Sequence, residues 1–138
     1  MFQSWVELIT TRDAFRKAVE SKDLDAMVAC LADDVVLHSP VTFKPFEGKD
    51  AVKVLFFALL QVFEDFRYIA EYQSDDSKVL KFEAMVASRI VEGIDILKFN
   101  GAGLIEDFTV MVRPLSAALA LADNVGAMLG YQPGPMTP

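Results

Sequence analysis

The middle of the chain alternates polar and apolar residues with a period of two, and this pattern restricts the fold more than any other feature. The alternation falls into four segments, near 66–74, 78–87, 90–99 and 104–113. Asp and Ser residues at 75–77 and two glycines within 100–103 mark two of the turns, and the turn near residues 88–89 is the weakest. Consecutive strands with such short connections predict an antiparallel meander.

The first part of the chain has helical periodicity instead. In "RDAFRKAVE", the apolar residues recur at helical spacing and form one inward-facing stripe, namely Ala14, Phe15, Ala18 and Val19. In "KDLDAMVACLADD", Asp23 is an N-cap, and a helix is expected to carry the stripe that follows it, namely Leu24, Met27, Val28 and Leu31. A third helix is expected over residues 50–63, covered on most sides because residues 54–60 are almost all apolar.

A short strand, "DVVLHSP", separates the second and third helices, and a small-residue helix, "LSAALALADNVGAML", follows the meander. Helices first, then antiparallel strands, then a closing helix predict an α+β fold with helices packed on one face of a curved antiparallel sheet. With 138 residues, we expect a single domain over residues 1–138.

Composition excludes several kinds of partner. The formal net charge of −7 repels phosphate backbones and anionic lipids, so we expect no nucleic-acid partner and no membrane association. The N-terminal residues lack a leader pattern and no apolar run reaches about 18 residues, which favours a cytoplasmic protein. One cysteine and one histidine cannot form a zinc cluster, and no phosphate-binding glycine loop is present, so we expect neither a metal nor a cofactor.

One carboxylate lies in an unexpected place. In the segment 90–99, Asp95 is the only ionisable residue on its face of the strand, which it shares with Val91, Gly93, Leu97 and Phe99. If this face is buried, loss of water should raise the pKa of Asp95. A lone buried carboxylate is unfavourable unless it is used or satisfied, so Asp95 is either a pocket residue or a structural aspartate bonded to nearby backbone.

The order of elements, together with "SKDLDAMVACLADDVVLHSPV", "FEGKDAV" and "GIDILKFNGAGLIEDF", resembles the nuclear transport factor 2-like superfamily, and within it the SnoaL-like, polyketide cyclase-like proteins. The resemblance covers nearly the whole chain. It implies a cone-shaped α+β barrel of the cystatin-like kind, with any active site inside the cone, and it favours a homodimer through the convex sheet face. It does not define the reaction, because this superfamily includes isomerases, cyclases, dehydratases, epoxide hydrolases and binding proteins.

The resemblance implies a role for Asp95, but the residues that act with this acid in the isomerases are replaced in this chain. "GIDILKF" matches the strand on which ketosteroid isomerases carry a neutral carboxylic acid that donates to the substrate oxyanion, which places Asp95 at that acid. The position of their catalytic base is Ser39 here, and the position of their helix tyrosine is Phe15. Neither residue can replace the lost group, so steroid isomerisation by that mechanism is disfavoured. Gly93 and Val110 likewise stand where the epoxide hydrolases need an arginine and an aspartate.

SnoaL-like cyclases carry an acid in the last strand, soon after the glycine turn, and Asp107 matches that position. Strict alternation puts Asp107 on one face with Ile105, Thr109 and Met111, whereas a shift by one residue would bring Glu106 inward instead. A solvated strand-end carboxylate is the alternative reading of Asp107.

His38 is a second candidate base, with a surface or partly buried histidine as the alternative reading. Alternation allows only one of His38 and Ser39 to face the cone.

The abundance of phenylalanine and methionine predicts an apolar cavity for a small hydrophobic molecule, although core packing is the first explanation for each of these residues. The candidate catalytic residues are Asp95, Asp107 and His38. The candidate pocket residues are Phe15, Ser39, Phe43, Phe57, Met85, Leu97, Thr109 and Met111. The leading hypothesis is a SnoaL-like protein that binds such a molecule, either as a cofactor-free acid/base cyclase, isomerase or dehydratase, or as a non-catalytic binding or dimerisation module.

Overall fold

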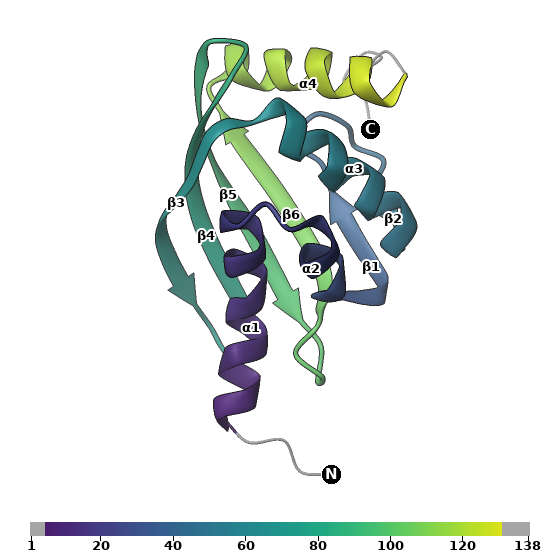
Figure 1. Cartoon of the computed structure of the whole chain (residues 1–138), viewed down its shortest axis with the longest axis vertical. Helices are drawn as coiled ribbons and strands as arrows, with labels where there is room; N and C mark the ends of the chain where they lie inside the picture. Colours follow the sequence, from purple (N-terminus) through teal and green to yellow (C-terminus); the bar gives the residue numbers. More distant parts are fainter. Residues whose placement is uncertain (1–4, 131–138) are drawn as a thin grey trace.

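A computed structural model describes the backbone of residues 5–130 and the side chains of residues 12–130, and it shows a curved sheet with helices on one face (Figure 1). The helices are α1 (Trp5–Glu20), α2 (Leu24–Ala29), α3 (Lys49–Val62) and α4 (Leu115–Leu129). The strands are β1 (Leu31–His38), β2 (Phe46–Glu47), β3 (Glu64–Gln73), β4 (Ser77–Val86), β5 (Arg89–Phe99) and β6 (Ile105–Arg113). We call the sheet face toward the helices the inner face and the opposite one the outer face. The α+β prediction is confirmed.

The six strands lie in the order β2-β1-β6-β5-β4-β3. Strands β3 to β6 form the predicted meander, in which each strand is antiparallel to the next. The expectation of a purely antiparallel sheet is wrong at one place, because β1 pairs with β6 in parallel. The long connection through α3 and four further strands allows this arrangement, which a tight turn does not.

The helix predicted to include Leu31 is shorter than expected. The Asp23 side chain accepts a hydrogen bond from the backbone N–H of Ala26 at 3.1 Å, so the predicted N-cap is confirmed. The helix then ends at Ala29, and Leu31 begins β1, where it lies opposite Ile105. Both of these side chains are fully buried, and burial in the sheet has outweighed the helical spacing of the sequence.

A cluster of ion pairs around one buried lysine holds α1 against the sheet. Lys78 in β4 is 2% exposed and pairs with Asp13 of α1 and, at 3.3 Å, with Glu71 of β3. Arg16 of α1 also binds Glu71, at 3.3 Å. A buried lysine needs such partners, and together they hold the helix that carries Phe15 over the inner face.

Helix α3 is only half covered in this chain. One stripe of α3 is buried, namely Val52, Leu55, Phe56 and Ala58. On the opposite side of the helix, Val54 is 54% exposed and Phe57 is 52% exposed. The expectation that α3 is covered on most sides is therefore wrong, because only one stripe of this apolar helix reaches the sheet.

Strand β6 contains a bulge at its beginning. Lys98 of β5 lies opposite Asp107, but the next residue, Phe99, lies opposite Ile105, so Glu106 is the extra residue. The bulge reverses the alternation of β6. Ile105, Phe108 and Val110 are buried on the inner face, whereas Thr109 and Met111 face outward.

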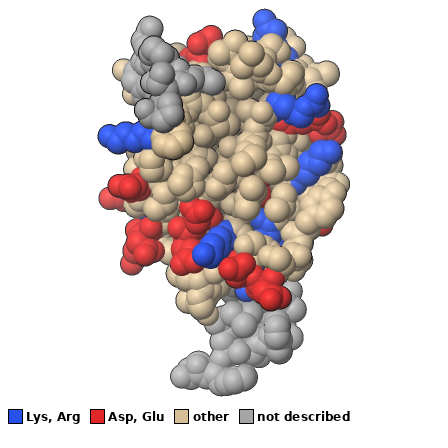
Figure 2. Space-filling view, turned by 180° about the vertical axis from the view of Figure 1, so that it is seen from behind, with Lys and Arg blue, Asp and Glu red and all other residues tan. Residues whose placement is uncertain are grey.

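The outer face of the sheet is open in the described chain. Figure 2 shows uncharged residues across the upper and central part of this face, with Lys, Arg, Asp and Glu side chains along its sides and across its lower part. Ile90 and Met111 are among the exposed large apolar residues there. None of the helices within residues 5–130 combines the length and apolar character needed to cross a membrane.

Candidate functional site

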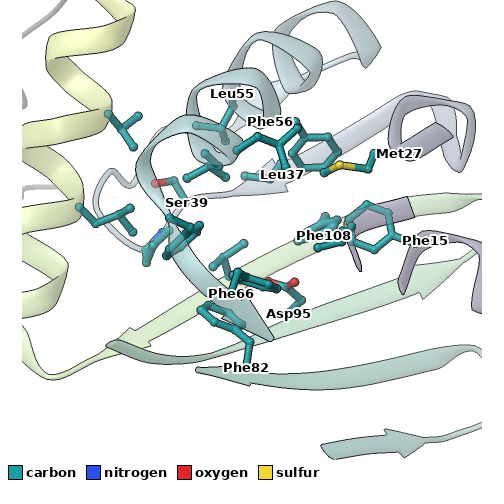
Figure 3. A pocket seen from close by; sticks show the side chains of 18 of the residues that line it. Phe15, Met27, Leu37, Ser39, Leu55, Phe56, Phe66, Phe82, Asp95 and Phe108 are labelled. Carbon is teal, nitrogen blue, oxygen red and sulfur yellow. The ribbon is translucent and has the colours of Figure 1, made fainter. Parts of the chain in front are cut away.

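A cavity of about 100 Å³ lies between the inner face of the sheet and the helices. Figure 3 shows its wall, in which side chains from the helices and from the inner face of the sheet converge. Phe15 of α1, Leu37 of β1, Leu55 and Phe56 of α3, and Phe108 of β6 all line it. Because most of the wall is apolar, the few polar groups in it determine what chemistry the cavity can offer.

Asp95 is the buried carboxyl of this wall. It lies in β5 between Leu80 of β4 and Val110 of β6, and only 6% of it is exposed. The burial pattern of β5 confirms the predicted face, with Val91, Gly93, Asp95, Leu97 and Phe99 all buried. Asp95 is therefore placed by the regular alternation of a central strand.

Burial raises the pKa of Asp95 from 3.8 to about 7, because the charged form loses its water. The Tyr68 hydroxyl donates a hydrogen bond to Oδ2 of Asp95 at 2.7 Å, which stabilises the charged form and moderates the rise. This rise corresponds to about 4 kcal/mol of disfavoured ionisation. Asp95 thus exchanges a proton near neutral pH, as an effective acid or base does.

Tyr68 was not found by sequence reasoning. It lies in β3, is 7% exposed and also lines the cavity, and burial together with the Asp95 charge raises its pKa well above the ordinary value. Its ring meets Phe66 edge-on with ring centroids 5.0 Å apart, and the Arg16 guanidinium lies 5.8 Å from its ring centroid. β4 separates Tyr68 from Asp95 in the sheet, so only the register of two strand pairs reveals the contact. The sequence signal that could have indicated Tyr68 is its spacing of two residues from Phe66, which places both side chains on one face of β3.

The two positions where the isomerase pattern fails both lie in the cavity wall. Ser39 follows β1 directly, and its hydroxyl accepts a hydrogen bond from the backbone N–H of Val41 at 3.2 Å. Phe15 packs edge-on against Phe108, with ring centroids 5.3 Å apart. The cavity therefore carries a hydroxyl and an apolar ring in these places, and neither group can take a proton from carbon.

The other two candidate catalytic residues lie on the outer face. His38 Nε2 and Asp107 Oδ1 are 2.8 Å apart, and both side chains are more than 40% exposed. The expectation that Asp107 faces the cone is wrong because the bulge at Glu106 reverses the alternation of β6. Glu106 does not replace it, since its carboxylate lies 3.7 Å from the Lys98 amine outside the cavity wall. The sequence correctly allowed only one of His38 and Ser39 to face inward, and that residue is Ser39.

Several predicted pocket residues lie elsewhere, although Phe15 and Ser39 do line the cavity. Phe43, in the loop before β2, is 73% exposed, and Phe57 occupies the outer stripe of α3. Leu97 is fully buried but belongs to the surrounding core. The remaining three predicted pocket residues, Met85, Thr109 and Met111, lie on the outer face of the sheet. The bulge in β6 accounts for Thr109 and Met111, and Met85 belongs to the outward-facing set of β4.

The described part of the chain contains no group of three or more His, Cys, Asp and Glu side chains arranged to hold a metal ion. The polar groups of the cavity wall are the Asp95 carboxyl and the hydroxyls of Tyr68 and Ser39, together with Glu20 at the end of α1 and Lys22 in the turn that follows it.

Comparison with known proteins agrees with this architecture. Residues 12–107 match the family model of the SnoaL-like domain, so the chain belongs to the SnoaL-like family and has the nuclear transport factor 2-like, cystatin-like fold. The solved structure of a steroid delta-isomerase from Pseudomonas aeruginosa is 36% identical, with a TM-score of 0.85 over 89% of this chain and 91% of that one. An uncharacterised protein with a cystatin-like fold from Silicibacter pomeroyi is 31% identical, with a TM-score of 0.83 over 87% and 85% of the two chains.

A more distant structure shares the fold alone. The epoxide hydrolase/cyclase-like enzyme of pyran ring formation in the polyether salinomycin is 16% identical, with a TM-score of 0.66 over 83% of this chain and 96% of that one. The same fold thus occurs in proteins named as a steroid delta-isomerase and as an epoxide hydrolase/cyclase-like enzyme, so the fold alone does not decide the function of this cavity.

Proposed function

We propose that the protein binds a small, mostly apolar molecule carrying a carbonyl oxygen, with Asp95 as the group that contacts this oxygen. The observation that carries the proposal is the buried Asp95–Tyr68 pair in the wall of an apolar cavity. Tyr68 occupies Oδ2, and within the described residues the structure gives Oδ1 no hydrogen-bond partner. A protonated Asp95 can therefore donate to a ligand oxygen while it accepts from Tyr68.

The size of the cavity restricts the ligand. Ordinary small-molecule pockets have volumes of roughly 300–1,000 Å³, whereas this cavity measures about 100 Å³. A single-ring or short-chain ketone is the class that suits it, and a four-ring steroid fits only if wall side chains move.

A cofactor-free isomerase is the reaction that the relatives favour, since the Pseudomonas aeruginosa protein is a steroid delta-isomerase. In that reaction we propose that ionised Asp95 faces the carbon between the carbonyl and the double bond instead of the carbonyl oxygen, and that it carries the proton itself, because Ser39 stands at the position of the isomerases' catalytic base. Ionised Asp95 removes the proton between the carbonyl and the double bond of a β,γ-unsaturated ketone and returns it to the γ-carbon. The double bond then moves into conjugation. The Ser39 hydroxyl, which accepts from the Val41 N–H, is the neutral donor for the transient enolate oxygen, while the Tyr68 hydroxyl stays bonded to Asp95.

The test uses two β,γ-unsaturated ketones, a cyclohexenone and an oxosteroid. NMR titration measures binding, and the absorbance of the conjugated enone measures turnover. We expect the cyclohexenone to bind and to isomerise, with turnover reduced about 100-fold or more in Asp95→Asn. Asp107→Asn is the matched control, because it changes a carboxylate on the neighbouring strand outside the cavity, and it should behave like the unmodified protein.

Two results would separate the parts of this proposal. Binding without turnover, weakened in Asp95→Leu, which removes the donor, supports a ligand-binding protein and rejects the isomerase. Equal binding by Asp95→Leu and Asp107→Asn rejects the role of Asp95.

The outer face favours a second candidate role, contact with another copy of this chain. Its centre is apolar and includes Ile94 and Met111, and charges of both signs lie close by, so a copy related by a twofold axis can set basic groups against acidic ones (Figure 2). Lys81 and Glu83 of β4 are examples of the two signs. We expect a dimer in analytical ultracentrifugation and a monomer for Met111→Lys, with Phe57→Lys on the exposed stripe of α3 as the control. A monomeric unmodified protein would reject this role.

A further inference from the structure

Gly93 lies in the middle of β5, two residues before Asp95 and on the same inner face. A Cβ atom at this position would lie 2.3 Å from Cζ and 2.7 Å from Cε2 of Phe82, and 2.7 Å from the carbonyl oxygen of Met111. These distances are far below ordinary contact, so no side chain fits here while Phe82 keeps its place. Glycine weakens the interior of a strand, and its presence often marks a close approach by another group.

The approaching group is the ring of Phe82, which belongs to β4 and lies directly opposite Gly93 in the sheet. The ring is 1% exposed, lines the cavity, and stacks on Phe66 with centroids 4.7 Å apart and planes inclined by 26°. Figure 3 shows Phe82 and Phe66 together beside Asp95, across the cavity from Leu55 and Phe56. Phe82 thus occupies space next to the carboxyl that a ligand would otherwise share.

We propose that Gly93 and Phe82 set the size limit of the cavity. The absence of a side chain at Gly93 admits the Phe82 ring, and the ring fills the sheet side of the cavity beside Asp95. Phe82 is the specificity-determining residue, and Gly93 is a positioning residue that acts through it. The inference deepens the proposed function by naming what restricts ligand size, and it rests on that function only for the identity of the ligand.

The steric part is tested without any ligand, by thermal unfolding of Gly93→Ala in two backgrounds. Leucine at position 82 lacks Cζ and Cε2, the two atoms that a Cβ at 93 would meet, while the contact with the Met111 oxygen stays the same in both backgrounds. We expect Gly93→Ala to lower Tm by about 5 °C more in the unmodified protein than in Phe82→Leu. Equal lowering in the two backgrounds would overturn the coupling of these residues.

The size limit is tested with two probes that lack a carbonyl group, benzene and naphthalene, by NMR titration. Truncating one large core side chain can leave a cavity of about 150 Å³ that binds benzene. We expect naphthalene to bind Phe82→Ala at least about tenfold more tightly than the unmodified protein, and the milder Phe82→Leu to change in the same direction. Phe99→Leu is the matched control, because it is a buried phenylalanine of the same sheet outside the cavity wall, and it should show no gain.

Naphthalene binding that is unchanged in both Phe82 variants, or equally improved in Phe99→Leu, would overturn the size limit. Failure of benzene and naphthalene to bind any variant would overturn it as well. Loss of ketone binding alone would instead reject the proposed function and leave the size limit in place, so the two failures are distinguishable.

Discussion

Asp95 and Asp107 lie on neighbouring strands of one sheet, yet they belong to opposite faces of it. Asp95 is buried beside Tyr68, and its pKa is raised to about 7 because it has lost its water. Asp107 is about 40% exposed and lies 2.8 Å from His38, where solvent screens the pair. The same side chain is thus a proton-exchanging group on one face and an ordinary surface partner on the other. The cavity, rather than the carboxylate alone, makes the candidate site.

The largest contrast should appear between two apolar residues of β6. Phe108 is 2% exposed on the inner face, and Met111 is 54% exposed on the outer face. We expect Phe108→Ala to lower the free energy of unfolding by about 3–5 kcal/mol. Met111→Ala should lower it by less than about 1 kcal/mol. Urea denaturation measures both, and a larger loss for Met111→Ala than for Phe108→Ala would contradict the reversal of faces by the bulge in β6.

Asp95 should make stability depend on pH with a defined sign. Its pKa in the folded protein is above the unfolded value of about 3.8, so the folded state binds more protons between pH 4 and 7. Stability contributed by this group is therefore lost as pH rises through that window, by about 4 kcal/mol in total. We expect Asp95→Asn to match the unmodified protein near pH 4 and to be more stable by about that amount at pH 8. Denaturation curves at the two pH values measure it, and parallel curves for the two proteins would contradict the burial of a charge at this site.

Tyr68→Phe removes the donor and keeps the ring. The Tyr68 hydroxyl stabilises ionised Asp95, so its loss should raise the pKa of Asp95 further and lower stability mainly at high pH. We expect a loss of about 1.5–3 kcal/mol at pH 8, and a smaller one at pH 4. Tyr72→Phe, on a tyrosine of the same strand that is 60% exposed, should change little. A loss of equal size at both pH values would indicate a packing effect without a charged hydrogen bond.

The smallest effect belongs to the outer pair. Asp107→Asn breaks a half-exposed contact with His38, and such pairs contribute about 0–1 kcal/mol. We expect a change in that range, reduced by added salt. Denaturation at low and high salt measures it, and a loss above about 2 kcal/mol would show that the outer face is buried in solution.

The fold was predictable because period-two alternation and turn residues are local signals, and they located β3 to β6 and the inward face of β5. What the sequence concealed depends on pairing between distant segments. The bulge at Glu106 reversed the face of Asp107, and nothing in "LIEDFTV" marks it. The hydrogen bond from Tyr68 to Asp95 spans an intervening strand, so it follows only from the register of β3, β4 and β5. Phe57 was wrongly predicted to line the pocket, because a helix that is apolar on most sides carries no pattern that shows which stripe faces the core.

The central claim is that Asp95 is a buried carboxyl that exchanges its proton near neutral pH. The direct measurement is the carboxyl ¹³C chemical shift of labelled aspartate as a function of pH, with the Asp95 signal assigned by its loss in Asp95→Asn. We expect a titration midpoint of about 7 for Asp95. A midpoint near the ordinary aspartate value of about 4 would contradict it, because Asp95 would then be a solvated carboxylate with no special chemistry.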